Sequence, residues 1–436
     1  MTVKKKVVIT GLGLATPLGL DVEDNWQKLL AGTSGISRIK LPDTAKSPVQ
    51  AVGEIKESDW TKIQKEFPEE AGQQGEKRTL FALWAARSAL GDAGMLSYTG
   101  NKDRCGVVFA AGIGINRPED IQKWISRDGN FDLLRFGREL KTLHRESIAR
   151  NNSHRAASLI AKKFELRGTN CTITTACASA TQALGTGYRA IQRGDADMIV
   201  AGGADSMINP IGLVFFVLLK AASVSSENPE SVCRPFDRKR SGLVMGEGAG
   251  VAILEEESHA KKRGARIIAE VAGYGSTMDA YQVTAPDPKG VGAGRSMLSA
   301  LKDAGMGDSD IDYINAHGTS TRLNDTAETV AIKRVFKENA YNISVSSSKS
   351  MIGHLLAASG GPEFIYTALS VQRDKVHPTV NLTNPDPKCD LDYVPNKMRA
   401  RTVRAAISNS FGFGGQNASI VVKKYNQDLQ DMSEKK

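Results

Sequence analysis

The sequence predicts an α/β protein in which two halves of similar architecture are fused, at residues 1–260 and 261–425, followed by a polar tail at 426–436. Short β-branched and apolar runs alternate with longer amphipathic stretches, which is typical of sheets layered with helices. A similar order of strands and helices returns in the second half, which indicates a duplicated architecture without a visible sequence repeat.

The first half contains four stretches that we expect to be strands and two that we expect to be helices. Apolar residues recur on one face of both 79–92 and 180–193, which predicts amphipathic helices there. The glycines and the proline of 11–19 predict a turn, and they do not match the dinucleotide-binding glycine pattern. The expected strands are 4–10, 105–110, 170–174 and 198–204.

The second half repeats this alternation of short strands and longer helices. Its β-branched and apolar runs predict strands at 267–274 and 311–315. The stretches expected to be helices are 297–304, 327–336 and 355–371.

Composition and charge restrict the class of protein. With 41% hydrophobic and 24% charged residues, the chain can bury a large globular core. The net charge is +9, but Lys and Arg are dispersed and no basic strip is interleaved with aromatic residues. This pattern argues against a nucleic-acid-binding module and leaves an acidic protein as a suitable partner.

The cysteine pattern and the apolar stretches indicate a compartment. Five cysteines, an odd number without C-x-x-C spacing, predict neither a disulfide framework nor a zinc site. The amino end lacks the apolar core of a secretory signal, and the longest apolar stretch is too short to cross a bilayer. We therefore expect a soluble, cytoplasmic protein without membrane attachment.

Cys177 lies in the segment TTACASA, between the expected strand 170–174 and the expected helix 180–193. Free backbone N–H groups and the positive end of the helix dipole are found at such a corner, and both favour a thiolate. The sequence therefore predicts a lowered thiol pKa and a nucleophile at neutral pH.

Two histidines occupy comparable settings. His317, in NAHGTST, follows the expected strand 311–315, and His354 ends SSSKSMIGH before the expected helix 355–371. The ends of strands are where open α/β sheets build their sites. The glycine-rich segment NSFGFGG at 409–415 allows backbone N–H groups to point at a ligand, as an oxyanion hole requires.

These four motifs, in this order, together with RPFD at 234–237 and MGEGAG at 245–250, resemble those of the β-ketoacyl-[acyl-carrier-protein] synthases, in particular the elongating type II enzymes. The resemblance runs from about residue 4 to residue 424. It implies a thiolase-like fold, in which two halves with mixed five-stranded sheets are layered with helices in the order αβαβα. It also implies an acyltransferase of fatty-acid biosynthesis.

The resemblance implies a decarboxylative Claisen condensation. Cys177 would take an acyl chain from an acyl-carrier protein, and malonyl-acyl-carrier protein would then lose CO₂. His317 and His354 would stabilise the enolate through Nε2, and its carbon would attack the acyl-Cys177 carbonyl to give 3-oxoacyl-acyl-carrier protein. The N–H groups of Cys177 and Phe413 would hold the oxyanion.

Further positions take their roles from the same resemblance. Lys349 would order the site electrostatically, and we expect Asp325 and Glu328 to be its charge partners. The other matching positions are Thr319 and Thr321 for the pantetheine amides, Phe413 as gate of the acyl pocket, and Glu363 and Phe411 as supporting residues.

The partners follow from the same resemblance. No metal and no diffusible cofactor is implied, because the phosphopantetheine arrives on its carrier protein. Such carriers are acidic, so basic residues around the entrance would steer docking. We expect a homodimer, with a heterodimer of homologous subunits as the alternative.

Other classes share parts of this pattern. The chain-extending ketosynthase of a type II polyketide or polyene pathway uses the same residues, sometimes beside a chain-length-factor homologue, and stays open. A thiolase would need a second cysteine in the final glycine loop and would lack His354. A chain-length-factor-like scaffold would lack the nucleophile, so Cys177 argues against it.

The chain departs from the common family pattern at four places. Segment 144–158 is polar, segment 211–222 is bulkier than usual, Arg322 replaces a common proline, and Gln416 stands where threonine is frequent. These departures leave the catalytic set intact and put acyl-chain preference and dimer pairing in doubt. The phenylalanine pair within the second segment, Phe215 and Phe216, could shorten the acyl pocket or fill the core, and we favour the core.

Overall fold

The computed structural model describes residues 4–40, 47–74, 76–114, 122–142, 149 and 152–426. Ten strands form its central sheet. Those of the first half are β1 (Val7–Ala15), β4 (Cys105–Ala111), β5 (Asn170–Ile173), β6 (Met198–Asp205) and β7 (Gly248–Glu256). Those of the second half are β8 (Ala269–Met278), β9 (Tyr313–Asn315), β10 (Ser344–Ser346), β13 (Ala405–Gly412) and β14 (Gln416–Lys423).

The two halves have the same strand order. The first runs β5-β4-β6-β7-β1 and the second runs β10-β9-β13-β14-β8. In each, the first three strands are parallel and the last two are antiparallel to their neighbours. The halves meet where Val7–Ile9 pairs with Ala269–Val271, which makes the two five-stranded sheets continuous. The predicted α/β fold with duplicated five-stranded sheets is confirmed.

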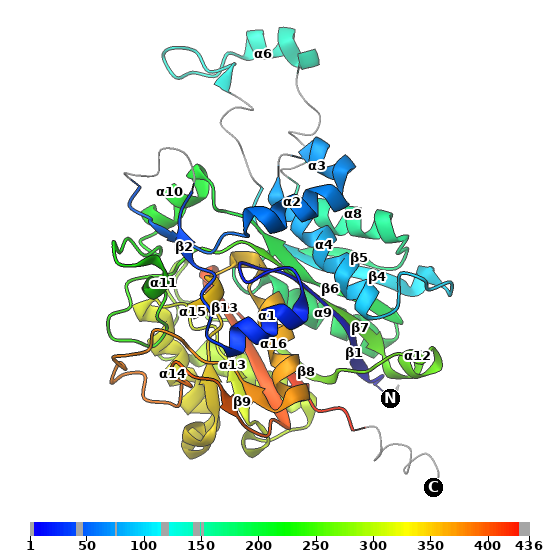
Figure 1. Cartoon of the computed structure of the whole chain (residues 1–436), viewed down its shortest axis with the longest axis vertical. Helices are drawn as coiled ribbons and strands as arrows, with labels where there is room; N and C mark the ends of the chain where they lie inside the picture. Colours follow the sequence, from blue (N-terminus) through cyan, green and yellow to red (C-terminus); the bar gives the residue numbers. More distant parts are fainter. Residues whose placement is uncertain are drawn as a thin grey trace.

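Helices cover both faces of each half-sheet (Figure 1). The long ones are α1 (Val22–Leu30), α2 (Glu57–Glu66), α4 (Lys77–Asp92), α8 (Arg155–Phe164), α9 (Ser179–Arg193), α10 (Pro210–Leu218), α13 (Val291–Ala304), α14 (Arg322–Phe336) and α16 (Gly360–Arg373). The short ones are α3 (Pro68–Gln74), α6 (Leu133–Glu139), α11 (Pro229–Val232), α12 (Glu257–Lys262) and α15 (Lys349–Ile352). Helices α9 and α16 lie between the half-sheets and contact both, with α4 and α8 outside one and α13 and α14 outside the other. The layers are therefore αβαβα.

The turn predicted at 11–19 is wrong for its first half, because β1 continues through Gly11 and Gly13 to Ala15. A Cβ atom on Gly13 would lie 2.0 Å from the carbonyl oxygen of Ala85 in α4. These glycines therefore allow a helix backbone to lie directly against the strand, and the chain turns only after Ala15.

The other predicted elements are present, most within a few residues of the expected bounds. The helix expected at 355–371 begins later, because residues 356–358 form a 3-10 turn in which Leu356 has a φ of 52°. Of the polar segment 144–158, residues 144–148, 150 and 151 lie outside the described residues, as does most of the predicted tail.

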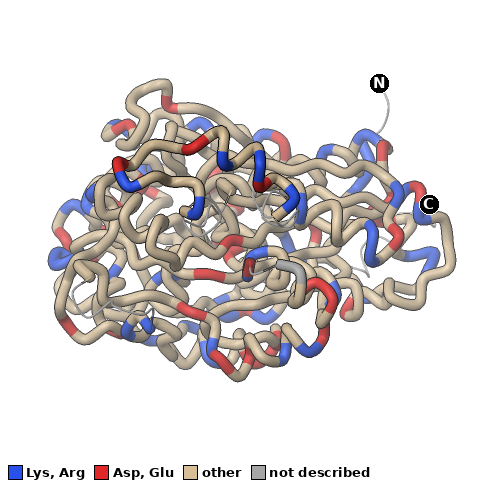
Figure 2. The backbone as a smooth tube through the Cα atoms, turned by 90° about the horizontal axis from the view of Figure 1, so that it is seen from above, with Lys and Arg blue, Asp and Glu red and all other residues tan. Residues whose placement is uncertain are grey.

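Two small two-stranded sheets, β2 (Ser37–Arg38) with β3 (Ala51–Val52) and β11 (Lys375–Val376) with β12 (Arg399–Ala400), complete the fold. The segment that carries α6 projects from the body (Figure 1). Basic and acidic residues are interleaved across the view in Figure 2. Within the described ranges, no helix combines the length and the apolar character that a membrane span needs.

Candidate active site

Cys177 lies in a tight turn between β5 and α9. Ser179 holds this turn, because its hydroxyl donates to the carbonyl of Ala176 at 2.6 Å and accepts from the N–H of Thr175 at 2.8 Å. Ala176 adopts a left-handed backbone with a φ of 48°, which is rare for a residue with a side chain and typical of functional turns. The turn places the Cys177 sulfur in the interior, where the residue is 6% exposed.

Burial reverses the expected pKa shift of Cys177. The interior position raises the pKa of this thiol to about 11, against the lowering by the Lys349 ammonium and by the N–H of Phe413. The prediction of a lowered pKa considered only the helix end, whereas Cys177 precedes the first residue of α9 and is almost fully shielded from water. The resting residue is therefore a thiol, and it becomes a thiolate only when a neighbouring group stabilises the charge.

His317 lies two residues after the end of β9, and the carboxylates of α14 hold its loop in place. Glu328 accepts the N–H groups of His317 and Gly318 at 2.9 and 2.8 Å, and Asp325 accepts the N–H of Thr319 at 3.0 Å. Both carboxylates are buried, so these bonds form in a setting of low polarity and fix the backbone strongly.

Lys349 is buried beside His317, but its charge partner differs from the prediction. Its ammonium pairs with Glu363 of α16, and it donates to the carbonyl oxygen of His317 at 2.6 Å and to Nδ1 of His317 at 3.3 Å. The expected partners, Asp325 and Glu328, bind backbone N–H groups, and Asp325 also faces Arg240 at 3.5 Å.

His354 lies between α15 and the 3-10 turn that precedes α16. Its backbone N–H donates to the carbonyl of Val244 at 2.7 Å, and its carbonyl accepts from the N–H of Gly246 at 2.8 Å. Its ring Nδ1 accepts from the N–H of Leu356 at 3.0 Å and lies 2.8 Å from the hydroxyl of Ser359. The motif MGEGAG therefore supports this histidine through the backbone.

The two imidazoles present the same tautomer to Cys177. Lys349 can only donate to Nδ1 of His317, and the Leu356 N–H donates to Nδ1 of His354, so the proton of each neutral ring lies on Nε2. Burial, together with the Lys349 ammonium, holds the pKa of both histidines well below 6.5. Both rings therefore stay neutral at physiological pH and offer an Nε2–H donor.

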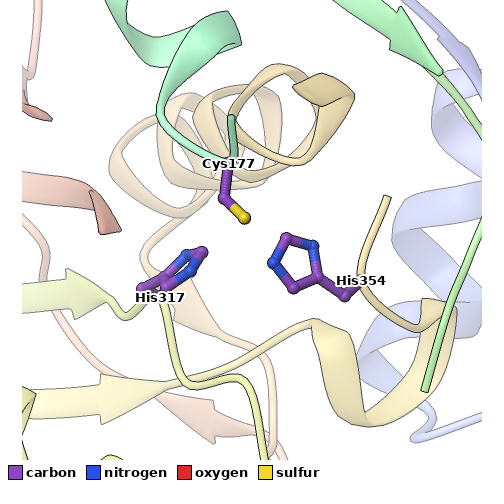
Figure 3. Close-up of side chains that lie close together, drawn as sticks. All are labelled: Cys177, His317 and His354. Atoms are coloured by element: carbon purple, nitrogen blue, oxygen red, sulfur yellow. The ribbon is translucent and has the colours of Figure 1, made fainter. Parts of the chain in front are cut away.

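The three side chains converge on one point (Figure 3). The Cys177 sulfur and one nitrogen from each histidine all lie within 4.8 Å of one another. The two rings are nearly perpendicular, with centroids 5.2 Å apart. A thiolate and two imidazoles can also bind zinc, but the protons on both Nε2 atoms make these nitrogens hydrogen-bond donors rather than metal ligands.

A glycine loop at the end of β13 lies against the backbone of Cys177. A Cβ atom on Gly412 would lie 2.9 Å from the backbone nitrogen of Cys177, so glycine allows the loop to approach the nucleophile. The N–H of Phe413 donates towards the Cys177 sulfur. The Phe413 N–H therefore borders the sulfur, where one of the two predicted oxyanion-hole donors is needed, and the Cys177 nitrogen lies beside Gly412 of the same loop.

A channel of about 500 Å³ leads from the surface to Cys177. Thr319 and Thr321 line it, with their hydroxyl oxygens 2.8 Å apart, and Phe411 and Phe413 form part of its apolar wall. Phe216 of α10 packs near Phe413, with ring centroids 6.4 Å apart. It is buried, as predicted for a residue that fills the core. Its neighbour Phe215 is 44% exposed, so core filling is wrong for that residue.

The structure thus brings all the predicted site residues together around the channel and behind it. Sequence reasoning missed Ser359 and the Leu356 N–H, which set the tautomer of His354. A serine five residues after the histidine was the available signal for the first of these. No sequence pattern identifies the Leu356 N–H as a donor, because nearly every residue type offers a backbone N–H.

Comparison with known proteins gives concordant findings. Residues 4–260 match the family model "Beta-ketoacyl synthase, N-terminal domain", and residues 268–383 match "Beta-ketoacyl synthase, C-terminal domain". The chain is 42% identical over 424 residues to "3-oxoacyl-[acyl-carrier-protein] synthase 2" of Synechocystis sp., covering 97% of this chain and 99% of the relative. It is 39% identical over 421 residues to the protein of the same name from Coxiella burnetii, again covering 97% and 99%.

One solved structure adds a polyketide relative. It is described as "AntDE:AntF (apo): type II PKS acyl-carrier protein in complex with its ketosynthase bound to the hexaketide". It superposes with a TM-score of 0.86 at 33% identity, and the match covers 97% of this chain and 100% of that one.

Proposed function

Because the chain belongs to the β-ketoacyl synthase family, with a thiolase-like fold, we propose that it is a 3-oxoacyl-acyl-carrier-protein synthase of fatty-acid chain elongation. The reaction joins an acyl group to malonyl-acyl-carrier protein with loss of CO₂. The first half, 1–260, supplies the nucleophile, and the second half, 261–425, supplies both histidines.

The first step loads the acyl chain onto Cys177. The sulfur attacks the thioester carbonyl of the acyl-carrier protein, a new C–S bond forms and the old one breaks, and the thiol proton ends on the departing pantetheine sulfur. The Nε2–H groups of His317 and His354 stabilise the thiolate as it develops, which offsets the burial that raises its pKa. The N–H groups of Cys177 and Phe413 hold the oxyanion, a contribution of about 3–4 kcal/mol for each donor.

The second step makes the carbon–carbon bond. Malonyl-acyl-carrier protein loses CO₂, and the enolate oxygen accepts hydrogen bonds from the two Nε2–H groups. The enolate carbon attacks the acyl-Cys177 carbonyl, the C–S bond breaks, and the Cys177 thiolate regains a proton from solvent. Neutral imidazoles suit this step, since they stabilise the enolate without protonating its carbon.

The observation that carries the proposal is the convergence of Cys177 with two neutral Nε2–H imidazoles at the inner end of a channel. Decarboxylation uses the imidazoles, whereas condensation also needs the sulfur. We therefore expect Cys177→Gln to lose condensation while retaining CO₂ release from malonyl-acyl-carrier protein, and His354→Ala to lose both. A folded Cys177→Gln variant that releases no CO₂ contradicts this division of roles.

The family chemistry needs no diffusible cofactor, because the phosphopantetheine is attached to the carrier protein. We propose that an acidic carrier docks where the channel opens and that the enzyme works in the cytoplasm, which agrees with its five free thiols.

We propose a homodimer that forms at the β5 edge. This strand ends the ten-stranded sheet, and the projecting segment, which lies between β4 and β5 in the sequence, exposes apolar side chains, including Leu133 at 72% and Leu134 at 76%. An open edge and an exposed apolar face together favour pairing with a second subunit. If the protein is a homodimer, light scattering of the purified chain gives the mass of two copies. A stable monomer favours a heterodimer with a homologous subunit.

A second candidate function is chain extension in a type II polyketide pathway. The match to the AntDE:AntF ketosynthase favours it, since that match covers 97% of this chain and 100% of the ketosynthase chain. The two functions predict different partners. Efficient turnover of long acyl groups by the purified protein alone supports fatty-acid elongation. Activity that appears only with a homologous partner subunit supports the polyketide function.

A further inference from the structure

Two exposed cations stand at the outer end of the channel that leads to Cys177. Lys220 follows α10, and Arg322 is the first residue of α14. Among the described residues, neither side chain forms an ion pair or a hydrogen bond with another protein group. The neighbouring Arg240 differs, since it is buried and paired with Asp325 and Asp386. Lys220 and Arg322 therefore have charge available for a ligand.

The position of Arg322 is unfavourable for the helix that it begins. The amino end of a helix carries partial positive charge, so a cation in the first turn costs stability, and a carboxylate is preferred there. Asp325 in the same turn is committed to the N–H groups of Phe236 and Thr319 and to Arg240. Helix stability therefore does not explain an arginine at this position, whereas binding of an anionic ligand in the channel does.

Three residues of one short segment line the channel from the interior to the solvent. Thr319 is buried near His317, Thr321 is half-buried, and Arg322 is exposed. A pantetheine arm whose thioester lies at Cys177 passes its amides along the two threonines. Its other end, a phosphodiester with one negative charge, then emerges at the level of Arg322.

We propose that Lys220 and Arg322 bind the phosphodiester of the carrier-bound phosphopantetheine arm, an inference that rests on the proposed synthase function. The planar guanidinium suits two phosphate oxygens, and the ammonium adds a point charge from the α10 side. Asp279 also lines the channel, but its carboxylate accepts from the side chain of Asn417 at 2.7 Å and from the N–H of Asp287 at 3.0 Å. Its charge is thereby satisfied by donors of the protein.

The test compares two small acyl donors that differ only in the phosphate. One is acyl-pantetheine, and the other is the methyl phosphodiester of acyl-phosphopantetheine. Intact-mass analysis measures the second-order rate constant for acylation of Cys177 by each. The ratio of the two constants isolates the phosphate, since the thioester and the amides are identical.

We expect the wild-type chain to prefer the phosphodiester by about 100-fold at low salt, about tenfold for each cation, and less at high salt. The variant Lys220→Gln/Arg322→Gln is expected to bring the ratio close to one. A control variant with the same net charge, Lys262→Gln/Lys302→Gln, changes exposed lysines that do not line the channel and is expected to keep the wild-type ratio.

The outcomes separate this inference from the proposed function. A wild-type preference that survives in Lys220→Gln/Arg322→Gln overturns the phosphate site, while Cys177 acylation still supports the synthase. A wild-type ratio near one also overturns it. If neither donor nor the intact acyl-carrier protein acylates Cys177, the synthase function fails and this inference fails with it.

Discussion

Replacing Lys349 with methionine tests the buried charge arrangement behind the site. The ammonium donates to the Glu363 carboxylate, to the His317 carbonyl and to Nδ1 of His317, and all three acceptors are buried. Lys349→Met keeps a long unbranched side chain, one atom shorter than that of lysine, and removes every donor. Oε2 of Glu363 already has no partner in the described residues, so the carboxylate loses its one cation.

The size of the effect follows from this geometry. Leaving one member of a buried ion pair alone costs about 3–5 kcal/mol of unfolding free energy. Replacing both members, in Lys349→Met/Glu363→Met, removes the lone charge and is expected to recover at least about 2 kcal/mol. Condensation is not recovered, because Nδ1 of His317 still lacks the donor that fixes its tautomer.

The pH dependence gives an independent check. Burial raises the pKa of Glu363 to about 7 even opposite Lys349, and removing the ammonium raises it further. The folded state then holds a proton that the unfolded chain has released, so stability falls as pH rises from about 4.5 to the folded pKa. Above pH 7 only the Lys349→Met variant keeps losing stability, by up to about 1.4 kcal/mol per pH unit.

Urea unfolding at matched protein concentration, at pH 7, 8 and 9, measures these differences for the wild type, the single variant and the double variant. The reasoning is refuted if Lys349→Met lies within about 1 kcal/mol of the wild type at pH 8, or if the double variant is no more stable than the single one. A stability gap that does not widen with pH would refute the role given to Glu363.

Two further predictions concern the nucleophile and the second histidine. Because the pKa of Cys177 is raised to about 11, alkylation of this residue by iodoacetamide should accelerate about tenfold per pH unit from pH 7 to 9, whereas a plateau by pH 8 would show a low-pKa thiolate. Ser359→Ala removes one hydrogen-bond partner of His354 Nδ1 but leaves the Leu356 N–H, so we expect kcat for condensation to fall about tenfold with little change in stability. Restoration by Ser359→Thr would support a positioning role, and an unchanged kcat for Ser359→Ala would contradict it.

Much of the fold follows from local pattern. Strand and helix stretches repeat in the two halves, and short-range periodicity is enough to locate most of them. The turn predicted at Gly11 and Gly13 is wrong, because glycine permits both a turn and the close approach of a helix. Only the partner helix, whose Ala85 carbonyl lies against Gly13, decides between these two uses.

The identities of the site residues were recognisable from sequence motifs, but their charge partners and pKa shifts were not. The charge partner of Lys349 is Glu363 of α16, whereas Asp325 and Glu328 of α14 accept from backbone N–H groups. The pKa of Cys177 depends on burial by residues far along the chain, and no local pattern records that. Residue identity was therefore predictable, while contacts and solvation required the folded structure.

The central claim is that Cys177 carries the acyl chain between two carrier-bound substrates. The most direct measurement is intact-mass analysis after incubation with acyl-carrier proteins of graded chain length, followed by addition of malonyl-acyl-carrier protein. The account predicts one acyl adduct, confined to Cys177, which malonyl-acyl-carrier protein converts to free enzyme and a 3-oxoacyl product. A folded enzyme that forms no adduct at any chain length, or an adduct that malonyl-acyl-carrier protein does not discharge, would contradict it.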